Sequence, residues 1–495
     1  MRSFKKFFIC FIVLPCILYT GVFLSTREVA YASEKERARN IILMIADGMG
    51  PGEFALALDY SLLIKRRELN MERVIKVGHL GLILTRPLLN LVTDSAASAT
   101  AMSTGKRTVI NRIAKSKQGK DQETILEIAK GMGKSTGLVT TTRISDATPA
   151  AFGSHSLSRE NRFEILDQFL EKGIDVLMGG GIQDWMPKKT RVGDFSKISL
   201  KAGAEKFSKR KDSKNLIREA KKKGYLFVSQ EDELIKAPDD IKLLGLFSSS
   251  HFLMALDRKK SDHTGIPNLA LMTEKALKVL YRNEGGFFLM IEGGRIDHAG
   301  HNNDAASVVA EILDFDEAVG AAFQFCKEKK DTLLLITSDH TTGGTGLSYI
   351  VRNKWGSDFG SLENLKAISR QGASFEKIWE EFGQKPTTDD IKRVIYKHTK
   401  IKISKSEAEF IKNPILLSPF HVTAYKNKKK VYTAHAIGRI LAKRYQVSWS
   451  TGGHTNIPVM LIGYGINSRK VAGLNENRYI FDVMKEAFGL SVIHP

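Results

Sequence analysis

Residues 287–301 decide the fold, and they read Phe-Phe-Leu-Met-Ile-Glu-Gly-Gly-Arg-Ile-Asp-His-Ala-Gly-His. The first five residues are apolar without interruption, which is typical of a strand buried on both faces. This apolar run ends abruptly at Glu292 and two glycines. If a helix follows, Asp297 and His301 stand one turn apart on the same face and can share a metal ion. The stretch therefore predicts a buried strand, a polar strand end and a helix that carries ligands.

Other short apolar runs also end in polar or glycine residues, and they lie at 41–46, 137–141, 175–178, 332–337 and 458–462. Helical patterns separate many of these runs, at 123–130, 163–172, 269–282, 305–327 and 480–488. Such alternation predicts an α/β fold with a doubly wound, mainly parallel central sheet and helices on both faces. Ligands of these sheets gather at the carboxyl ends of the strands. Asp47, Glu292, Asp339 and His340 all follow predicted strands.

The N-terminus predicts a signal peptide over residues 1–32. Basic residues open it, an apolar run occupies 7–24, and Ala30-Tyr31-Ala32 fits the small-x-small cleavage rule. We expect an exported protein, periplasmic or extracellular. If the segment stays uncleaved, it would instead anchor the chain to a membrane.

The remaining residues, 33–495, predict one α/β domain with insertions around 186–260 and 345–447. The first insertion is rich in lysine, and the second contains helical patches without recognisable chemistry. Cys326 is the sole cysteine after the signal segment, which excludes an intrachain disulfide and favours a buried thiol. The formal net charge is +21, but no nucleic-acid-binding motif accompanies it, so specific nucleic-acid binding is not expected.

A serine at a predicted helix start supplies a candidate nucleophile. Asp94 and Ser95 open a run of small residues, and the N-terminus of a helix favours phosphate or a serine alkoxide. On its own such a serine is more simply a packing residue. Ligands for two catalytic metal ions, three side chains each, stand elsewhere in the chain: Asp47, Asp297, His301, Asp339, His340 and His454.

These motifs, in this order, resemble those of the alkaline phosphatase family. The matching segments are 40–50, 93–100, 146–151, 155–159, 292–301, 338–340 and 453–455. The resemblance runs from Asn40 to the C-terminal strand, interrupted by the two insertions. It implies an alkaline phosphatase-like α/β fold, hydrolysis of small phosphate monoesters, and in many members a homodimer.

The resemblance also implies two zinc ions and one magnesium ion. The first zinc would be held by Asp297, His301 and His454, and the second by Asp47, Asp339 and His340. Magnesium would be held by Asp47, Thr148 and Glu292, together with waters. Ligands that include nitrogen suit zinc, whereas ligands that are oxygen alone suit magnesium.

In the reaction that the resemblance implies, Ser95 attacks phosphorus and becomes a phosphoserine, which water then hydrolyses. Arg159 grips two phosphate oxygens, and Asp94 orients this arginine. Asp146 is paired by motif with His298, where some bacterial members carry a lysine. That departure leaves the affinity for phosphate and the dependence on magnesium open.

Two other functions remain as alternatives. One is a phosphodiesterase of the same superfamily, although Arg159 on two phosphate oxygens favours monoesters. A sulfatase does not fit, because Ser95 is followed by alanines rather than by the Ser-x-Pro-x-Arg pattern. The other is a non-catalytic relative that binds metal or phosphate, which the intact Ser95 and ligand set disfavour.

Overall fold

The computed structural model describes residues 37–196, 206–258, 265–348, 360–414 and 428–492. The predicted signal peptide, residues 1–32, lies outside these ranges. Within them, no helix has both the length and the apolar character that crossing a membrane requires.

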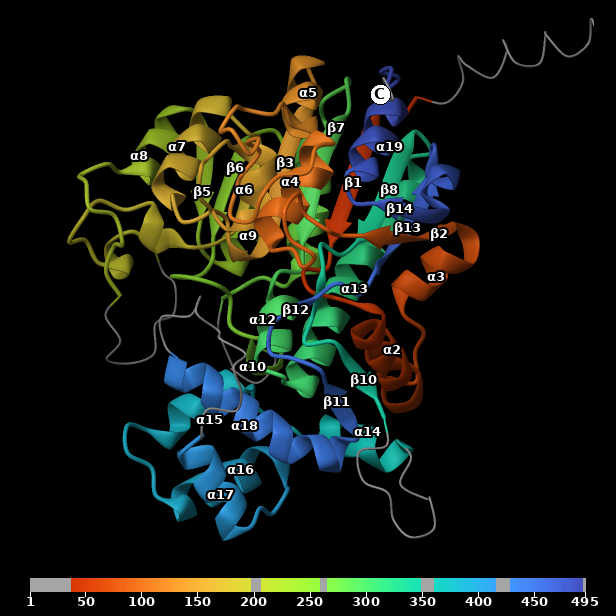
Figure 1. The fold of residues 1–495 in the computed structure, drawn as a ribbon. Coiled ribbons are helices and arrows are strands. Elements are labelled where there is room, and N and C mark those ends of the chain that lie inside the picture. The colour runs from red at the N-terminus through yellow and green to blue at the C-terminus, as the bar shows by residue number, and fades with distance from the viewer. Residues whose placement is uncertain (1–36, 197–205, 259–264, 349–359, 415–427, 493–495) are drawn as a thin grey trace, which may run out of the picture.

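A ten-stranded sheet occupies the centre of the molecule (Figure 1). From edge to edge its strands are β14 (Gly473–Glu476), β2 (His79–Leu84), β13 (Val459–Gly465), β8 (Thr332–Thr337), β1 (Asn40–Ile45), β7 (Phe287–Glu292), β3 (Ser135–Arg143), β4 (Val176–Gly180), β6 (Lys242–Leu246) and β5 (Tyr225–Val228). Strand β13 runs antiparallel to β8 and β2, and the other neighbouring strands are parallel. The mainly parallel α/β sheet predicted from the sequence is confirmed.

Strand β1 shows why the apolar runs are continuous. Each of its six residues is buried. Ile42 and Met44 belong to one hydrophobic core, whereas Ile41, Leu43 and Ile45 belong to a second core on the opposite face. Since successive side chains of a strand point to opposite faces, a sheet covered on both sides needs apolar residues at every position.

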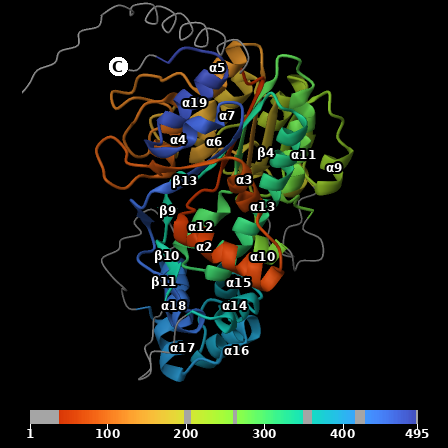
Figure 2. The same cartoon turned by 90° about the vertical axis from the view of Figure 1, so that its right-hand side faces the viewer.

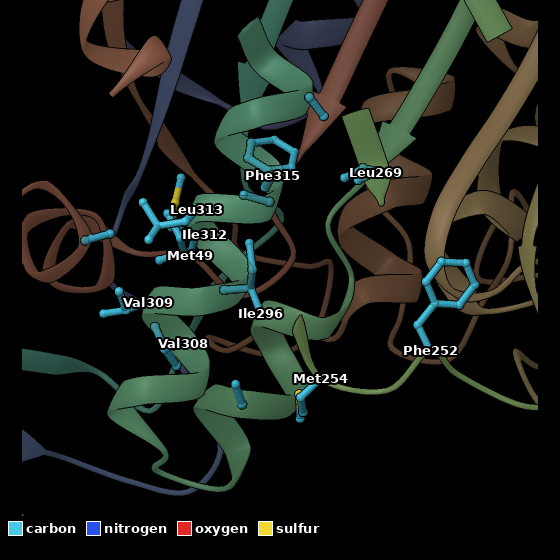
Figure 3. Close-up of a cluster of buried hydrophobic side chains, with 14 of the residues drawn as sticks. Met49, Phe252, Met254, Leu269, Ile296, Val308, Val309, Ile312, Leu313 and Phe315 are labelled. Carbon is cyan, nitrogen blue, oxygen red and sulfur yellow. The ribbon is translucent and has the colours of Figure 1, made fainter. Parts of the chain in front are cut away.

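Helices supply both cores. The first core includes residues of α2 (Pro51–Tyr60), α3 (Asn70–Val77), α11 (Leu269–Tyr281), α12 (Arg295–His301) and α13 (Ala305–Glu328). Figure 3 shows part of it, where Ile296 of α12 lies near Val308 and Ile312 of α13. The second core includes residues of α4 (Ser95–Thr104), α5 (Ile125–Gly131), α6 (Ala147–Gly153), α7 (Arg162–Lys172) and α19 (Tyr479–Ala487). Cys326 of α13 is a buried free thiol.

The lysine-rich region 186–260 is partly built into the sheet. It supplies β5 and β6, which extend the sheet beyond β4, together with α8 (Leu216–Lys222), α9 (Glu231–Lys236) and α10 (Ala255–Arg258). These two strands are only four and five residues long, and lysines surround them. Short strands in such a polar setting gave no clear pattern in the sequence.

The region 345–447 forms a group of helices at one end of the molecule, which we call the helical insert (Figures 1 and 2). It comprises α14 (Leu362–Ser369), α15 (Phe375–Phe382), α16 (Thr388–Thr399), α17 (Lys405–Lys412) and α18 (Lys428–Tyr445). Two short antiparallel ribbons join the chain entering the insert to the chain leaving it. One pairs β10 (Thr345–Leu347) with β11 (Val447–Trp449), and the other pairs β9 (Thr341–Thr342) with β12 (His454–Thr455).

Candidate active site

Three neighbouring strands bring acidic residues to one edge of the sheet. Strand β1 lies between β7 and β8, and all three are parallel. Their carboxyl ends are therefore adjacent, with Asp47 just beyond β1, Glu292 at the end of β7, and Asp339 and His340 just beyond β8. All four side chains are buried. The sheet thus assembles residues that lie up to 293 positions apart, as expected for a ligand site of a parallel sheet.

A first group of potential ligands centres on α12. Asp297 Oδ1 lies 3.3 Å from Nε2 of His301, one helical turn later. The Nε2 atom of His454 lies 3.1 Å from Nε2 of His301 and 3.5 Å from Oδ1 of Asp297. The Nδ1 atom of His454 bonds the backbone carbonyl of Thr93 at 2.8 Å. The three side chains predicted for one metal ion therefore converge, and backbone support fixes the orientation of His454.

A second group lies beside the first, and it includes the predicted nucleophile. His340 Nε2 is 3.2 Å from Oδ2 of Asp339 and 3.6 Å from Oδ1 of Asp47. The Oγ atom of Ser95, the first residue of α4, lies 3.2 Å from the same Nε2 atom. The helix start therefore faces the metal-ligand candidates.

Glu292 forms a third part of the cluster. It accepts a hydrogen bond from Thr140 and another from Thr142 Oγ1 at 3.3 Å, and the hydroxyl of Thr148 lies close enough to favour its charged form. Burial raises the pKa of Glu292 to about 7. Burial, followed by the charge of Asp339, raises the pKa of Asp47 well above its usual value. These carboxylates repel one another, and a bound cation would relieve that repulsion.

The polar atoms of the cluster fit metal ions. Asp47 Oδ1 and Asp339 Oδ2 are buried but have no hydrogen-bond partner within the described residues. Buried polar atoms normally have partners, and a bound cation would supply one for both carboxylate oxygens. Among the described residues, potential ligand atoms also lie within 4.8 Å of one another in the group of Asp297, His340 and His454 and in the group of Asp47, Asp339 and His340.

Arg159 is held from two sides. Its Nη1 atom lies 3.4 Å from Oδ2 of Asp94, and its Nη2 atom lies 3.1 Å from Oδ1 of Asp146. Asp94 also caps α4, because its Oδ1 accepts the backbone N–H of Ala97 at 3.0 Å. One carboxylate thus fixes both the start of the serine helix and the position of the arginine.

The structure places a further histidine between Asp146 and His298. His251 Nδ1 lies 3.7 Å from Oδ2 of Asp146, and the ring of His251 packs against that of His298 with 4.6 Å between centres. His298 Nδ1 pairs with Nη1 of Arg295 at 2.8 Å. Burial alone would raise the pKa of Asp146, but the charges of Arg143 and Arg159 outweigh it and hold the pKa below its usual value.

Several residues of the site were not foreseen. Thr140 and Thr142 hold Glu292, and Thr342 Oγ1 donates a hydrogen bond of 2.6 Å to Oδ1 of Asp297. The threonines carried a usable signal, because Thr140 and Thr142 stand near the end of a strand and Thr342 stands two residues after His340. His251 carried none, since nothing in the sequence shows that β6 lies beside β4.

A parallel α/β sheet whose strand ends gather acids and histidines around a serine defines a hydrolase that depends on metal ions. Residues 38–490 match the family model described as alkaline phosphatase, and the chain belongs to this family. It is therefore an enzyme that hydrolyses phosphate monoesters, as predicted from the motifs.

Known relatives agree in sequence and in structure. The chain is 34% identical to alkaline phosphatase 3 of Bacillus subtilis, with coverage of 97% of this chain and 96% of the relative. It is 29% identical to the repressible alkaline phosphatase of Saccharomyces cerevisiae, covering 92% and 81% of the two chains. The crystal structure of the Thermus thermophilus alkaline phosphatase matches with a TM-score of 0.82 at 32% identity, covering 94% of each chain.

Proposed function

We propose that this alkaline phosphatase works through a phosphoserine formed on Ser95, with Arg159 binding the phosphoryl group. The observation that carries the proposal is the position of Ser95 Oγ, 3.2 Å from His340 Nε2 at the start of α4. The first N–H groups of a helix and its positive end stabilise negative charge on a serine oxygen or on a phosphate.

Arg159 would bind two non-bridging oxygens of the phosphoryl group. Because Asp94 and Asp146 hold its guanidinium, little conformational freedom is lost when substrate binds. A guanidinium fork fits two oxygens of a phosphate monoester, whereas a diester has a second substituent on one of its oxygens. This fit supports monoesters as substrates.

In the first half of the reaction, Ser95 Oγ would form a bond to phosphorus as the bond from phosphorus to the ester oxygen breaks. The serine loses its proton, and the leaving alkoxide gains one to depart as the alcohol. In the second half, water would attack the phosphoserine in the same geometry. Inorganic phosphate leaves, and Ser95 regains its proton for the next cycle.

The donor atoms support two zinc ions and one magnesium ion. Asp297, His301 and His454 would hold one zinc, and Asp47, Asp339 and His340 the other. Asp47, Thr148 and Glu292 offer oxygen alone, which suits magnesium. When bound, zinc would lower the pKa of the serine hydroxyl and of the attacking water, and it would stabilise charge on the leaving oxygen.

Trapping the phosphoserine tests the proposal. A ³²P-labelled monoester is mixed with enzyme and quenched in acid, and labelled protein is counted. The wild type should carry label on Ser95, whereas Ser95→Ala should carry none and lose at least about 10³-fold in kcat. Ser103→Ala is the matched control, because Ser103 lies in the same helix and bonds the carbonyl of Ala151. Full labelling of Ser95→Ala would refute the role of this serine.

The diesterase alternative needs a separate comparison. Hydrolysis of 4-nitrophenyl phosphate and bis(4-nitrophenyl) phosphate, which share one leaving group, is measured under identical conditions. We expect kcat/KM to favour the monoester. A strong preference for the diester would overturn the assignment of monoesters as the natural substrate class.

The predicted signal segment, residues 1–32, supports export of the protein.

The exposed surface supports a homodimer. Leu82 of β2 faces Leu474 of β14 in register, and both side chains are exposed, as is Leu80. Exposed apolar side chains grouped on a sheet edge are typical of a protein interface. We propose that a second copy covers this face, and Leu82→Asp should then convert a dimer to a monomer in size-exclusion chromatography with light scattering.

A further inference from the structure

The helical insert contacts α12 at both ends of that helix. At its first residue, Arg295 Nη2 pairs with Oε2 of Glu376 on α15 at 2.9 Å. At its last residue, the backbone carbonyl of His301 bonds Nε2 of His435 on α18 at 2.5 Å. Arg295 is almost fully buried, so its pairing with Glu376 is shielded from water. The insert therefore reaches the one helix that carries Asp297 and His301.

The insert also binds Asp304, the N-cap residue of α13. Asp304 accepts hydrogen bonds of 2.8 Å from the side chain of Gln371 and from the backbone N–H of Phe375. Asp304 is buried and caps α13 through the N–H of Ser307. Segment 295–304 is thus attached to the insert at its start, middle and end.

His435 supports His301 in a second way. The Nδ1 atom of His301 bonds the backbone carbonyl of Gly452 at 2.7 Å, which leaves Nε2 to face Asp297 and His454. Gly452 packs so closely on the ring of His435 that a Cβ atom there would overlap the ring. His435 therefore fixes both the backbone of His301 and the carbonyl that orients its ring, a kind of contact that tunes metal affinity.

A helix as short as α12 needs such support. It has seven residues, it follows two glycines, and an isolated helix of this length is unstable in water. Ile296 of α12 is packed in the same hydrophobic core as residues of α13 (Figure 3). The contacts from the insert restrain its two ends, where Asp297 and His301 stand one turn apart.

We propose that the helical insert is a clamp on α12, in which Glu376 and His435 are positioning residues that set how tightly Asp297 and His301 hold metal. The proposal rests on the metal ligands assigned under the proposed function. It gives the insert a role in building the site, although none of its side chains belongs to the predicted ligand set.

Zinc affinity measures the clamp directly. Full-length holoenzyme variants are dialysed against a graded series of zinc chelator concentrations, and retained zinc is measured by mass spectrometry. Glu376→Asp keeps the charge but shortens the side chain, and His435→Asn withdraws the donor from the carbonyl of His301. Each should lower by about tenfold the affinity for the zinc assigned to Asp297, His301 and His454. Their thermal unfolding after complete metal removal should stay close to that of the wild type.

Matched controls exist within the insert. Glu381 lies on the same helix as Glu376, and its side chain has a similar exposure of 29% against 26%. Its partners are Lys397 and His398, both inside the insert. Glu381→Asp and His398→Asn therefore disturb the insert without touching α12, and both should retain zinc as the wild type does.

The outcomes separate the clamp from the proposed function. If the wild type holds zinc and all four variants retain it equally, the clamp is overturned and the ligand assignment stands. Equal zinc loss in the controls and the test variants also overturns it, because the insert would then act through general stability. If the wild type takes up no zinc, the metal sites of the proposed function are refuted, and the clamp is refuted with them.

Discussion

Removing the guanidinium of Arg159 should be the most informative single change at this site. Hydrogen bonds that involve a charged group each contribute roughly 1.5–3 kcal/mol. Two such bonds to a phosphoryl group total about 3–6 kcal/mol, which corresponds to about 10²–10⁴ in kcat/KM. Arg159→Ala should therefore lose activity by this factor. Arg159→Lys should lose less, because it keeps the charge without the fork.

The surroundings of Arg159 indicate that these variants fold. When Arg159 is replaced, Asp146 still has its ion pair with Nη2 of Arg143, at 3.3 Å. Asp94 still accepts hydrogen bonds from the backbone N–H groups of Ala97 and Asn111. The side chain of Arg159 is 25% exposed, so its removal leaves room for water rather than a sealed cavity. The loss should therefore appear in catalysis and much less in thermal stability.

The assay is steady-state hydrolysis of 4-nitrophenyl phosphate, with the inhibition constant for inorganic phosphate measured in parallel. Both KM and the phosphate inhibition constant should rise in Arg159→Ala, and circular dichroism should show an unchanged fold. An unchanged phosphate constant, with kcat/KM within tenfold of the wild type, would refute the role of Arg159 as the phosphate ligand.

Three further outcomes are expected. Asp94→Ala should lower the free energy of unfolding by about 1 kcal/mol, because the helix cap is lost, and should also raise KM. Asp94→Asn should keep most of the cap and still raise KM; urea unfolding and steady-state kinetics measure the two effects. Chelation should abolish hydrolysis and added zinc should restore it; full activity of metal-free protein would contradict the metal sites. Burial raises the pKa of Glu311 to about 7 in the folded chain, so its contribution to stability is present below its unfolded pKa near 4.5 and lost as pH rises through 7. Glu311→Gln should therefore gain stability relative to the wild type between pH 5 and pH 8, by up to about 3 kcal/mol, as urea unfolding at a series of pH values will show.

The sequence predicted the centre of the fold because the central strands are covered on both faces. Runs such as 41–46 and 333–336 have no polar position, and each is followed within three residues by an aspartate, Asp47 or Asp339. The last two strands at one side of the sheet, β6 and the edge strand β5, escaped recognition because they are short and surrounded by lysine. The sequence of a single strand shows whether both of its faces are buried. It does not show which strands are its neighbours in the sheet.

The predicted ligands Asp47, Glu292 and Asp339 lie together because β1 is the parallel neighbour of both β7 and β8. Parallel neighbours place their carboxyl ends side by side, whereas the sequence alone did not show that these three strands are neighbours. The supporting contacts depend on tertiary packing between segments far apart in the chain. The nearness of His251 to Asp146, or of His435 to His301, follows from where helices dock and has no signature in local spacing.

The place of β13 in the sheet has a consequence for how the enzyme is made. Its residues, 459–465, are synthesised long after residues 79–84, yet β13 lies between β8 and β2 in the sheet. His454 arrives on the same late segment. A growing chain therefore has an incomplete sheet and an incomplete ligand set until its C-terminal part is synthesised. Long-range closure of this kind is slow, so we expect the complete sheet and the complete ligand set to form late in folding.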